Sequence, residues 1–120
     1  MKKIEAVIKP FKLDEVRQAL RGAGVCDMTV SEVFRCAPGE ARRDTYRGLA
    51  YALDLVPKMK LEIAVPDCRA NQVVDLVIRA TRAGATEVGA IFVSPLADAI
   101  RIRTGERGEA ALWPTAAAAS

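Results

Sequence analysis

Residues 58–65 show the most regular pattern in the chain, because large apolar residues occupy every second position from 59 to 65. Successive side chains of a β-strand point to opposite faces, so this alternation predicts a strand with one buried face. Similar segments predict further strands at residues 2–9, 28–34 and 90–93. The chain is therefore expected to form a small sheet with one face in the core and the other in contact with water or another chain.

Two helical patterns separate these strands. Apolar residues recur at the three-and-four spacing of an amphipathic helix from Leu13 to Leu20, and a second apolar stripe runs from the capping residue Asp67 to about residue 83. The order strand, helix, strand, strand, helix, strand is typical of the ferredoxin-like βαββαβ fold. This α+β fold has both helices on one face of an antiparallel sheet. Alternation at residues 99–104 predicts one additional short C-terminal strand.

Length and composition limit the kind of protein that this chain can be. Its 120 residues suffice for one domain, and 51% apolar with 28% charged residues is the balance of a folded globular protein. No apolar run reaches bilayer length and the first residues lack a secretory-signal pattern, so we expect a cytoplasmic protein without membrane insertion. A core of this size gains apolar burial from contact with further copies, which favours a homo-oligomer.

The residue inventory excludes several classes of site. The chain has no histidine and only three cysteines, which excludes histidine-based catalytic pairs and zinc sites with histidine ligands. A net charge of +3 and 5% aromatic residues fall short of a nucleic-acid-binding surface. We therefore expect no enzyme, no catalytic residue, no metal and no nucleic-acid partner. A ferredoxin-like enzyme or nucleic-acid module stays open as an alternative, because a fold does not fix a function.

The strand predicted at residues 99–104 carries the clearest candidate for ligand binding. Arg101 and Arg103 are two positions apart, so both guanidinium groups would leave the same face of the strand. Each could grip a phosphate or carboxylate with two parallel hydrogen bonds. The alternative is that both arginines are merely solvated or paired with Glu106 and Glu109.

Residues 36–54 form the least patterned part of the chain. Glycine, proline and charged residues replace the periodicity seen on either side. Because a compact domain seldom carries so long a loop without a function, we expect this segment to have one.

Four stretches of the sequence, in order, resemble the PII signal-transduction proteins. They are MKKIEAVIKPFKLDEV at the start, MTVSEV at 28–33, YRGLAY at 46–51, and IFVSP with RIRTGERGE at 91–95 and 101–109. The resemblance covers residues 1–112, which we interpret as one PII-like domain followed by a tail at 113–120. It implies a homotrimer that binds an adenine nucleotide between neighbouring subunits and regulates a transporter or an enzyme.

The resemblance also assigns roles to three loops. Residues 36–54 match the T-loop that docks on target proteins, 83–90 match the B-loop, and 101–108 match the C-loop. In such proteins the adenine base is read from the sheet, whereas the phosphates meet the B-loop and two arginines of the C-loop. The implied nucleotide-binding residues are Thr29, Glu62, Ala64, Glu87, Val88, Gly89, Ala90, Arg101 and Arg103.

The chain departs from the usual PII pattern at two places. PII proteins normally carry glycine, arginine and glutamine at the T-loop base, where the glutamine helps to hold magnesium and 2-oxoglutarate. Here residues 37–39 are Ala, Pro and Gly. The B-loop has Ala90 in place of a phosphate-binding lysine and Glu87 in place of a glycine.

The changes in the B-loop remove one positive charge and add one negative charge near the phosphates. Two unit charges about 4 Å apart interact by roughly 4 kcal/mol at an effective dielectric near 20, so these changes disfavour binding of ATP, the nucleotide with the most phosphate charge. We therefore expect ADP or AMP to bind better than ATP, with no response to 2-oxoglutarate.

Two further expectations follow from the resemblance. PII-like proteins linked to inorganic-carbon uptake or carboxysomes bind bicarbonate beside an adenine nucleotide, and we expect such an anion near Gly39, Lys58 and Arg101. Tyr51 matches the tyrosine that many bacterial PII proteins have uridylylated.

The alternative to a protein that binds ADP or AMP and bicarbonate is a conventional nitrogen regulator that responds to ATP and 2-oxoglutarate and controls ammonium uptake. The changed T-loop base disfavours that alternative.

Overall fold

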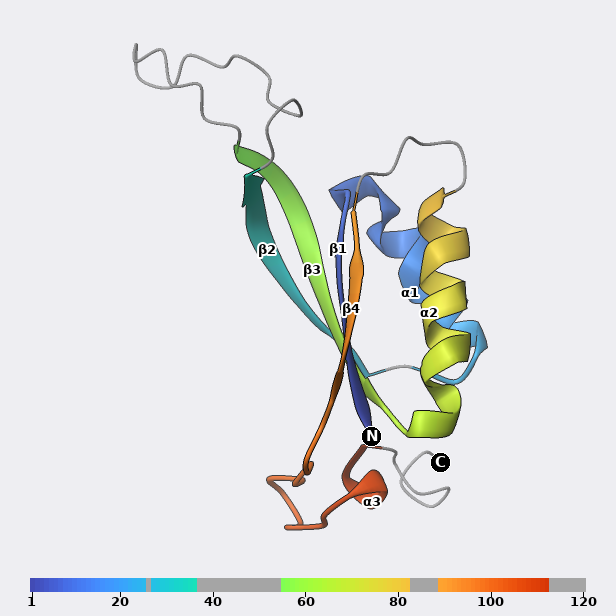
Figure 1. Cartoon of the computed structure of the whole chain (residues 1–120), viewed down its shortest axis with the longest axis vertical. Helices are drawn as coiled ribbons and strands as arrows, with labels where there is room; N and C mark the ends of the chain where they lie inside the picture. The colour runs from blue at the N-terminus through green and yellow to red at the C-terminus, as the bar shows by residue number, and fades with distance from the viewer. Residues whose placement is uncertain (26, 37–54, 83–88, 113–120) are drawn as a thin grey trace.

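The computed structural model describes residues 1–25, 27–36, 55–82 and 89–112 (Figure 1). Both predicted helices and the four main predicted strands are present within these ranges. In chain order the elements are β1 (Lys2–Ile8), the single-turn 3-10 helix η1 (Pro10–Lys12), α1 (Leu13–Gly22), β2 (Thr29–Cys36), β3 (Leu55–Val65), α2 (Asp67–Arg82), β4 (Ile91–Pro95) and α3 (Glu109–Leu112).

The four strands form one antiparallel sheet in the order β2-β3-β1-β4. Helices α1 and α2 contact each other and lie on one face of this sheet (Figure 1). This is the ferredoxin-like arrangement that the order of the elements predicts, so the α+β fold class is confirmed. Among the described residues, no helix covers the opposite face of the sheet, which we call the open face.

The core lies between the sheet and the two long helices. Alternate residues of the central strands β1 and β3 point into it, and Ile4 lies opposite Ile63 across these two strands. The helices contribute residues at the three-and-four spacing of an apolar helix face. Apolar side chains with 3% exposure or less are Ile4, Ala6, Ile8, Val16, Leu20, Leu61, Ile63, Val65, Val73 and Val77.

The hairpin formed by β2 and β3 extends beyond the rest of the sheet (Figure 1). β1 pairs with β3 only as far as Ile8, which lies opposite Met59, whereas β2 continues along β3 until Cys36 lies opposite Leu55. Cys36 is therefore the last residue of a strand. The rest of the predicted T-loop, residues 37–54, lies outside the described residues.

The strand predicted at residues 99–104 is wrong. The chain forms a turn and one isolated bridge there, and it reverses direction at Gly105 and Gly108. These glycines have φ angles of 75° and 73°, in the left-handed region that other residues rarely adopt. Ile100 and Ile102 are 51% and 100% exposed. The alternation in this segment therefore corresponds to no buried face, which is why the predicted strand does not form.

Truncation of Leu61 is expected to test the position of the core. Leu61→Ala should lower the free energy of unfolding by roughly 2–5 kcal/mol, because it leaves a cavity at a fully buried position on a central strand. Leu55→Ala is the matched control, since Leu55 belongs to the same strand but is 45% exposed. Its expected cost is about 1 kcal/mol or less. Urea denaturation at one fixed protein concentration measures both values, and equal losses would contradict this core.

Candidate functional site

A pocket of about 340 Å³ opens beside the first residues of β1, and we call it the first pocket. It brings together the three residues expected to read adenine, Thr29, Glu62 and Ala64. The strand register explains their proximity, because Thr29 lies opposite Glu62 across β2 and β3 and Ala64 lies two residues farther along β3. The first pocket is lined by Lys3, Asp27, Met28, Thr29, Glu62, Ile63, Ala64, Leu96 and Leu112.

A second pocket, also of about 340 Å³, lies towards the other end of β1. Gly89 and Ala90, the described residues of the predicted B-loop, line it because β4 begins directly after them, with Ile91 opposite Ala6. Four steps along the strand, roughly 13 Å of extended chain, lead from Lys3 in the first pocket to Val7 in the second. The second pocket is lined by Glu5, Val7, Val33, Phe34, Arg35, Lys60, Gly89, Ala90 and Phe92.

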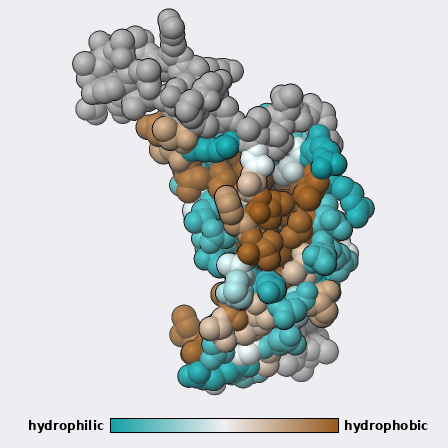
Figure 2. Space-filling view, viewed as in Figure 1, coloured by the Kyte–Doolittle hydropathy of each residue, from teal (hydrophilic) through white to brown (hydrophobic). Residues whose placement is uncertain are grey.

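Gly89 and Ala90 also border a larger hollow of about 580 Å³ between α2 and the sheet. Figure 2 shows hydrophobic side chains gathered in a hollow between β4 and α2. Val74 and Ile78 of α2 and Ile91 of β4 are among its lining residues. The predicted B-loop therefore ends between this hollow and the second pocket.

The two arginines of the predicted C-loop have different environments. Arg101 is half-buried, and its Nη2 donates hydrogen bonds to the carbonyl oxygens of Ala110 at 3.0 Å and Ala111 at 3.4 Å. Arg103 is exposed in the turn and forms no hydrogen bond or ion pair with another described residue. The prediction that both guanidinium groups leave one face of a strand is wrong, because no strand forms there.

Both arginines nevertheless lie at the end of the sheet where the first pocket opens. The segment after β4 turns below the start of β1 and leads into α3 (Figure 1). Arg101 contacts the last turn of α3, and Leu112 at the end of α3 lines the first pocket. One subunit therefore places the C-loop at the end of β1 where Thr29 and Glu62 line the first pocket, and Gly89 and Ala90 at the other end of β1.

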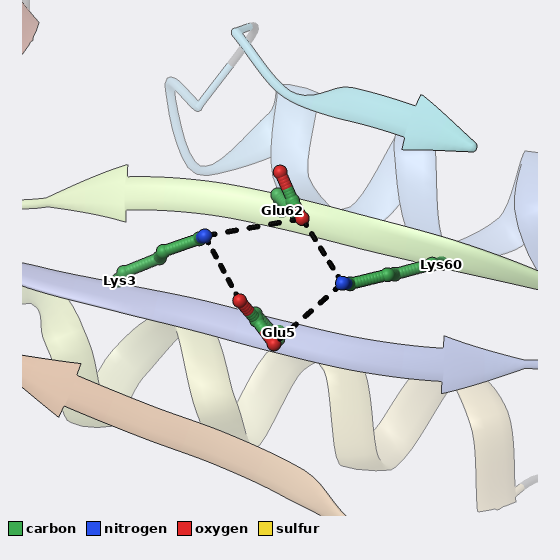
Figure 3. A network of polar contacts seen from close by, with 4 residues as sticks. All are labelled: Lys3, Glu5, Lys60 and Glu62. Atoms are coloured by element: carbon green, nitrogen blue, oxygen red, sulfur yellow. Dashed lines mark ion pairs between the residues drawn. The ribbon is translucent and has the colours of Figure 1, made fainter.

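Four charged side chains form a ring of ion pairs on the open face, which we call the charge ring (Figure 3). Lys3 pairs with Glu5 at 2.9 Å and with Glu62 at 3.9 Å, and Lys60 pairs with Glu62 at 3.2 Å and with Glu5 at 3.9 Å. The hydrogen bond from Lys3 holds the pKa of Glu5 below its usual value, and the same bond raises the pKa of Lys3. Lys3 and Glu62 line the first pocket, whereas Glu5 and Lys60 line the second.

The other residues expected to bind ligands are dispersed or lie outside the described residues. Lys58 is buried, at 3% exposure, on β3 opposite Val33 and thus at the end of the sheet away from Arg101. A single subunit therefore does not bring Lys58 and Arg101 together. The candidates outside the described residues are Gly39, Tyr51, Glu87 and Val88.

Sequence reasoning missed Leu96 and Leu112, which line the first pocket. Leu96 follows β4 and is held by its N–H group, which donates a hydrogen bond to the carbonyl oxygen of Met1 at 3.0 Å. Leu112 ends the short helix α3. Neither belongs to a periodic pattern, so no signal in the local sequence could have indicated them.

Two classes of feature are absent from the part of the chain that the structure describes. Within residues 1–25, 27–36, 55–82 and 89–112, no three histidine, cysteine, aspartate or glutamate residues gather in a way that could hold a metal ion. No helix within the same ranges has the length and apolar character needed to cross a membrane.

Comparison with known proteins identifies the family. The family model described as Nitrogen regulatory protein P-II matches residues 1–106. The chain belongs to the PII family. The Nitrogen regulatory protein P-II of Cereibacter sphaeroides is 47% identical over 112 residues, which cover 93% of this chain and 100% of that protein. The Nitrogen regulatory protein P-II 1 of Escherichia coli (strain K12) is 48% identical with the same coverage.

Membership of this family confirms two predictions from the sequence. The resemblance to PII proteins was correct, and PII proteins are signalling regulators rather than enzymes. PII proteins form homotrimers that bind adenine nucleotides and 2-oxoglutarate and regulate partner proteins. The names of the relatives agree better with the nitrogen-regulatory alternative than with the bicarbonate hypothesis.

The lowered pKa of Glu5 makes the contribution of the charge ring depend on pH. A carboxylate whose folded pKa lies below its unfolded value stabilises the protein above about pH 4, and this contribution disappears as the pH falls through the folded pKa. We therefore expect wild type to be more stable than Glu5→Gln at pH 7, with a difference that shrinks on acidification towards pH 3.

Denaturant midpoints from pH 7 to pH 3, at constant protein concentration, measure this difference. Glu32→Gln is the control, because Glu32 is an exposed glutamate of the same sheet that pairs with no other described residue. This control should stay close to wild type throughout. A Glu5→Gln difference that is constant over the whole range would contradict the role of the ring.

Proposed function

We propose that this chain is a nitrogen-regulatory signalling protein. It acts in the cytoplasm as a homotrimer, binds one adenine nucleotide between each pair of neighbouring subunits, and controls a partner protein through residues 37–54. The observation that carries this proposal is the 47–48% identity to nitrogen regulatory PII proteins over the whole length of those relatives. The distribution of the candidate residues over the subunit agrees with it.

The positions of the phosphate-binding candidates suggest that one nucleotide site is built from two copies of the chain. Arg101 and Arg103 lie at the end of β1 where the first pocket opens, whereas Gly89 and Ala90 lie at the opposite end. The five residues of β4, roughly 16 Å of extended chain, separate these two groups, which is too far for both to hold the phosphates of one nucleotide within a single subunit. In a ring of subunits, the first pocket of one copy would complete the site at the B-loop of its neighbour. Heterologous contacts of this kind close into rings such as trimers.

The position of the T-loop suits a docking segment. Residues 37–54 connect the far ends of β2 and β3, which continue past the last pair between β1 and β3. Phe34 and Leu55 near this end are 70% and 45% exposed, so the hairpin offers apolar side chains for contact. A transporter or an enzyme could be bound there without covering the first pocket. Tyr51, the candidate for modification, belongs to the same segment.

A second candidate function is favoured by the composition of the nucleotide-binding loops. Residues 37–39 are Ala, Pro and Gly, so the side-chain oxygen that holds magnesium and 2-oxoglutarate in typical PII proteins is missing. Ala90 supplies no positive charge to a phosphate. Under this hypothesis the protein prefers ADP or AMP to ATP and binds bicarbonate as its second ligand.

Calorimetric titration distinguishes the two candidates. A conventional nitrogen regulator should bind Mg-ATP and 2-oxoglutarate with mutual reinforcement, whereas the second candidate should bind ADP more tightly than ATP and bicarbonate only in the presence of ADP. Sedimentation of the same samples measures the number of subunits. A lone subunit, or a protein that binds no adenine nucleotide, would overturn both candidates.

Restoring a positive charge at position 90 is expected to favour nucleotides with more phosphates. Ala90→Lys should strengthen ATP binding more than AMP binding, because attraction between unit charges about 4 Å apart reaches roughly 4 kcal/mol before screening. Gln72→Lys is the control, since it adds the same charge at an exposed position of α2 away from both pockets. Calorimetry of ATP and AMP with both variants gives the two ratios. Equal gains for ATP and AMP would argue against a phosphate near this residue.

A further inference from the structure

The short helix α3 supplies a wall of the first pocket. Leu112, its last residue, is half-buried and lines that pocket together with Thr29, Glu62 and Ala64. α3 contacts β3, the strand that carries Glu62 and Ala64. A helix of four residues has too few internal hydrogen bonds to persist without support from its surroundings. The position of Leu112 therefore depends on whatever holds α3 in place.

Arg101 provides part of that support. Carbonyl groups in the last turn of a helix lack partners within the helix, and the Nη2 of Arg101 donates to two of them, on Ala110 and Ala111. The guanidinium also brings a positive charge to the helix end that favours one.

The backbone of Arg101 is fixed in turn by the loop in which it lies. Its N–H group donates to the carbonyl oxygen of Glu106 at 2.9 Å, and its own carbonyl oxygen accepts from the N–H group of Gly105 at 2.7 Å. The side chain of Arg101 therefore links a closed loop to the end of α3. Arg103 makes no comparable contact with the described residues.

We propose that Leu112 is a further contact of the adenine base and that Arg101 is the residue that positions it. This inference rests on the proposed nucleotide site and adds a function to it. Arg101 then affects binding of the base as well as binding of phosphate, whereas Arg103, exposed in the turn, acts on phosphate alone. The two arginines thus have separable roles in one site.

Adenosine is the probe that separates these roles, because it has the base but no phosphate. Displacement of a fluorescent ADP analogue measures its affinity even when binding is weak. Leu112→Ala should weaken adenosine and ADP by the same factor, roughly three- to tenfold, as expected when part of a leucine no longer packs on the ligand. Arg101→Ala should weaken adenosine by a similar factor and ADP by more. Arg103→Ala should weaken ADP only.

The double variant Arg101→Ala/Leu112→Ala tests whether the two residues act together. Its affinity for adenosine should be close to that of Leu112→Ala alone, since an arginine that acts through Leu112 has no further effect once Leu112 is truncated. Arg101→Lys keeps a charge and a donor and should recover part of the adenosine affinity. Leu112 lies outside the core, and circular dichroism together with sedimentation confirms that each variant folds and assembles.

Unchanged adenosine affinity in either Arg101→Ala or Leu112→Ala would overturn this inference and leave the nucleotide site intact, provided that wild type binds ADP. Independent, additive losses in the double variant would also overturn it. Wild type that binds neither adenosine nor ADP would overturn the proposed function together with this inference.

Discussion

The burial of one face of the sheet is the constraint on which the rest of this molecule depends. Alternate residues of β1 and of the 61–65 part of β3 pack against α1 and α2, and this requirement fixes which residues of the two strands lie opposite each other. A shift of one residue would turn every core side chain towards the open face. β2 pairs with β3 in a register of its own, which sets Thr29 opposite Glu62. Burial of Leu61 and Ile63 turns Glu62 towards the open face, where it lines the first pocket.

The open face has a different chemistry because no helix covers it within the described residues. Its central positions carry the charge ring, whose side chains are about one-third exposed. Ion pairs at this exposure contribute little to stability, so their arrangement matters more than their energy. The ring reaches both pockets, with two members in each, and therefore occupies the surface between the two parts of the proposed nucleotide site.

The sequence predicts most of the fold because alternation and helical spacing report burial directly. Leu61 and Ile63 alternate and are buried, as expected, whereas Ile100 and Ile102 alternate and are exposed. The difference is set by Gly105 and its neighbours, which reverse the chain before a strand can form. Turn geometry thus overrides a pattern that is too short to have its own buried face.

Apart from Arg101 and Arg103, the residues of the candidate site were accessible from sequence only through the family resemblance. That resemblance led to Thr29, Glu62 and Ala64, which the structure places in one pocket. Leu96 and Leu112 reach the same pocket from segments far along the chain, and contacts of that kind leave no periodic signal. The contact of Arg101 with α3 was equally hidden, since it depends on a turn that the alternation at residues 99–104 did not indicate.

The alternation of signs in the charge ring limits how its four positions can diverge between related proteins. Each corner touches two neighbours of opposite sign, so a reversal at Glu5 would turn two attractions into two repulsions. Loss of an adjacent lysine and glutamate together leaves the remaining pair neutral and intact. Lys3, Glu5, Lys60 and Glu62 should consequently covary, drifting as balanced couples rather than one at a time.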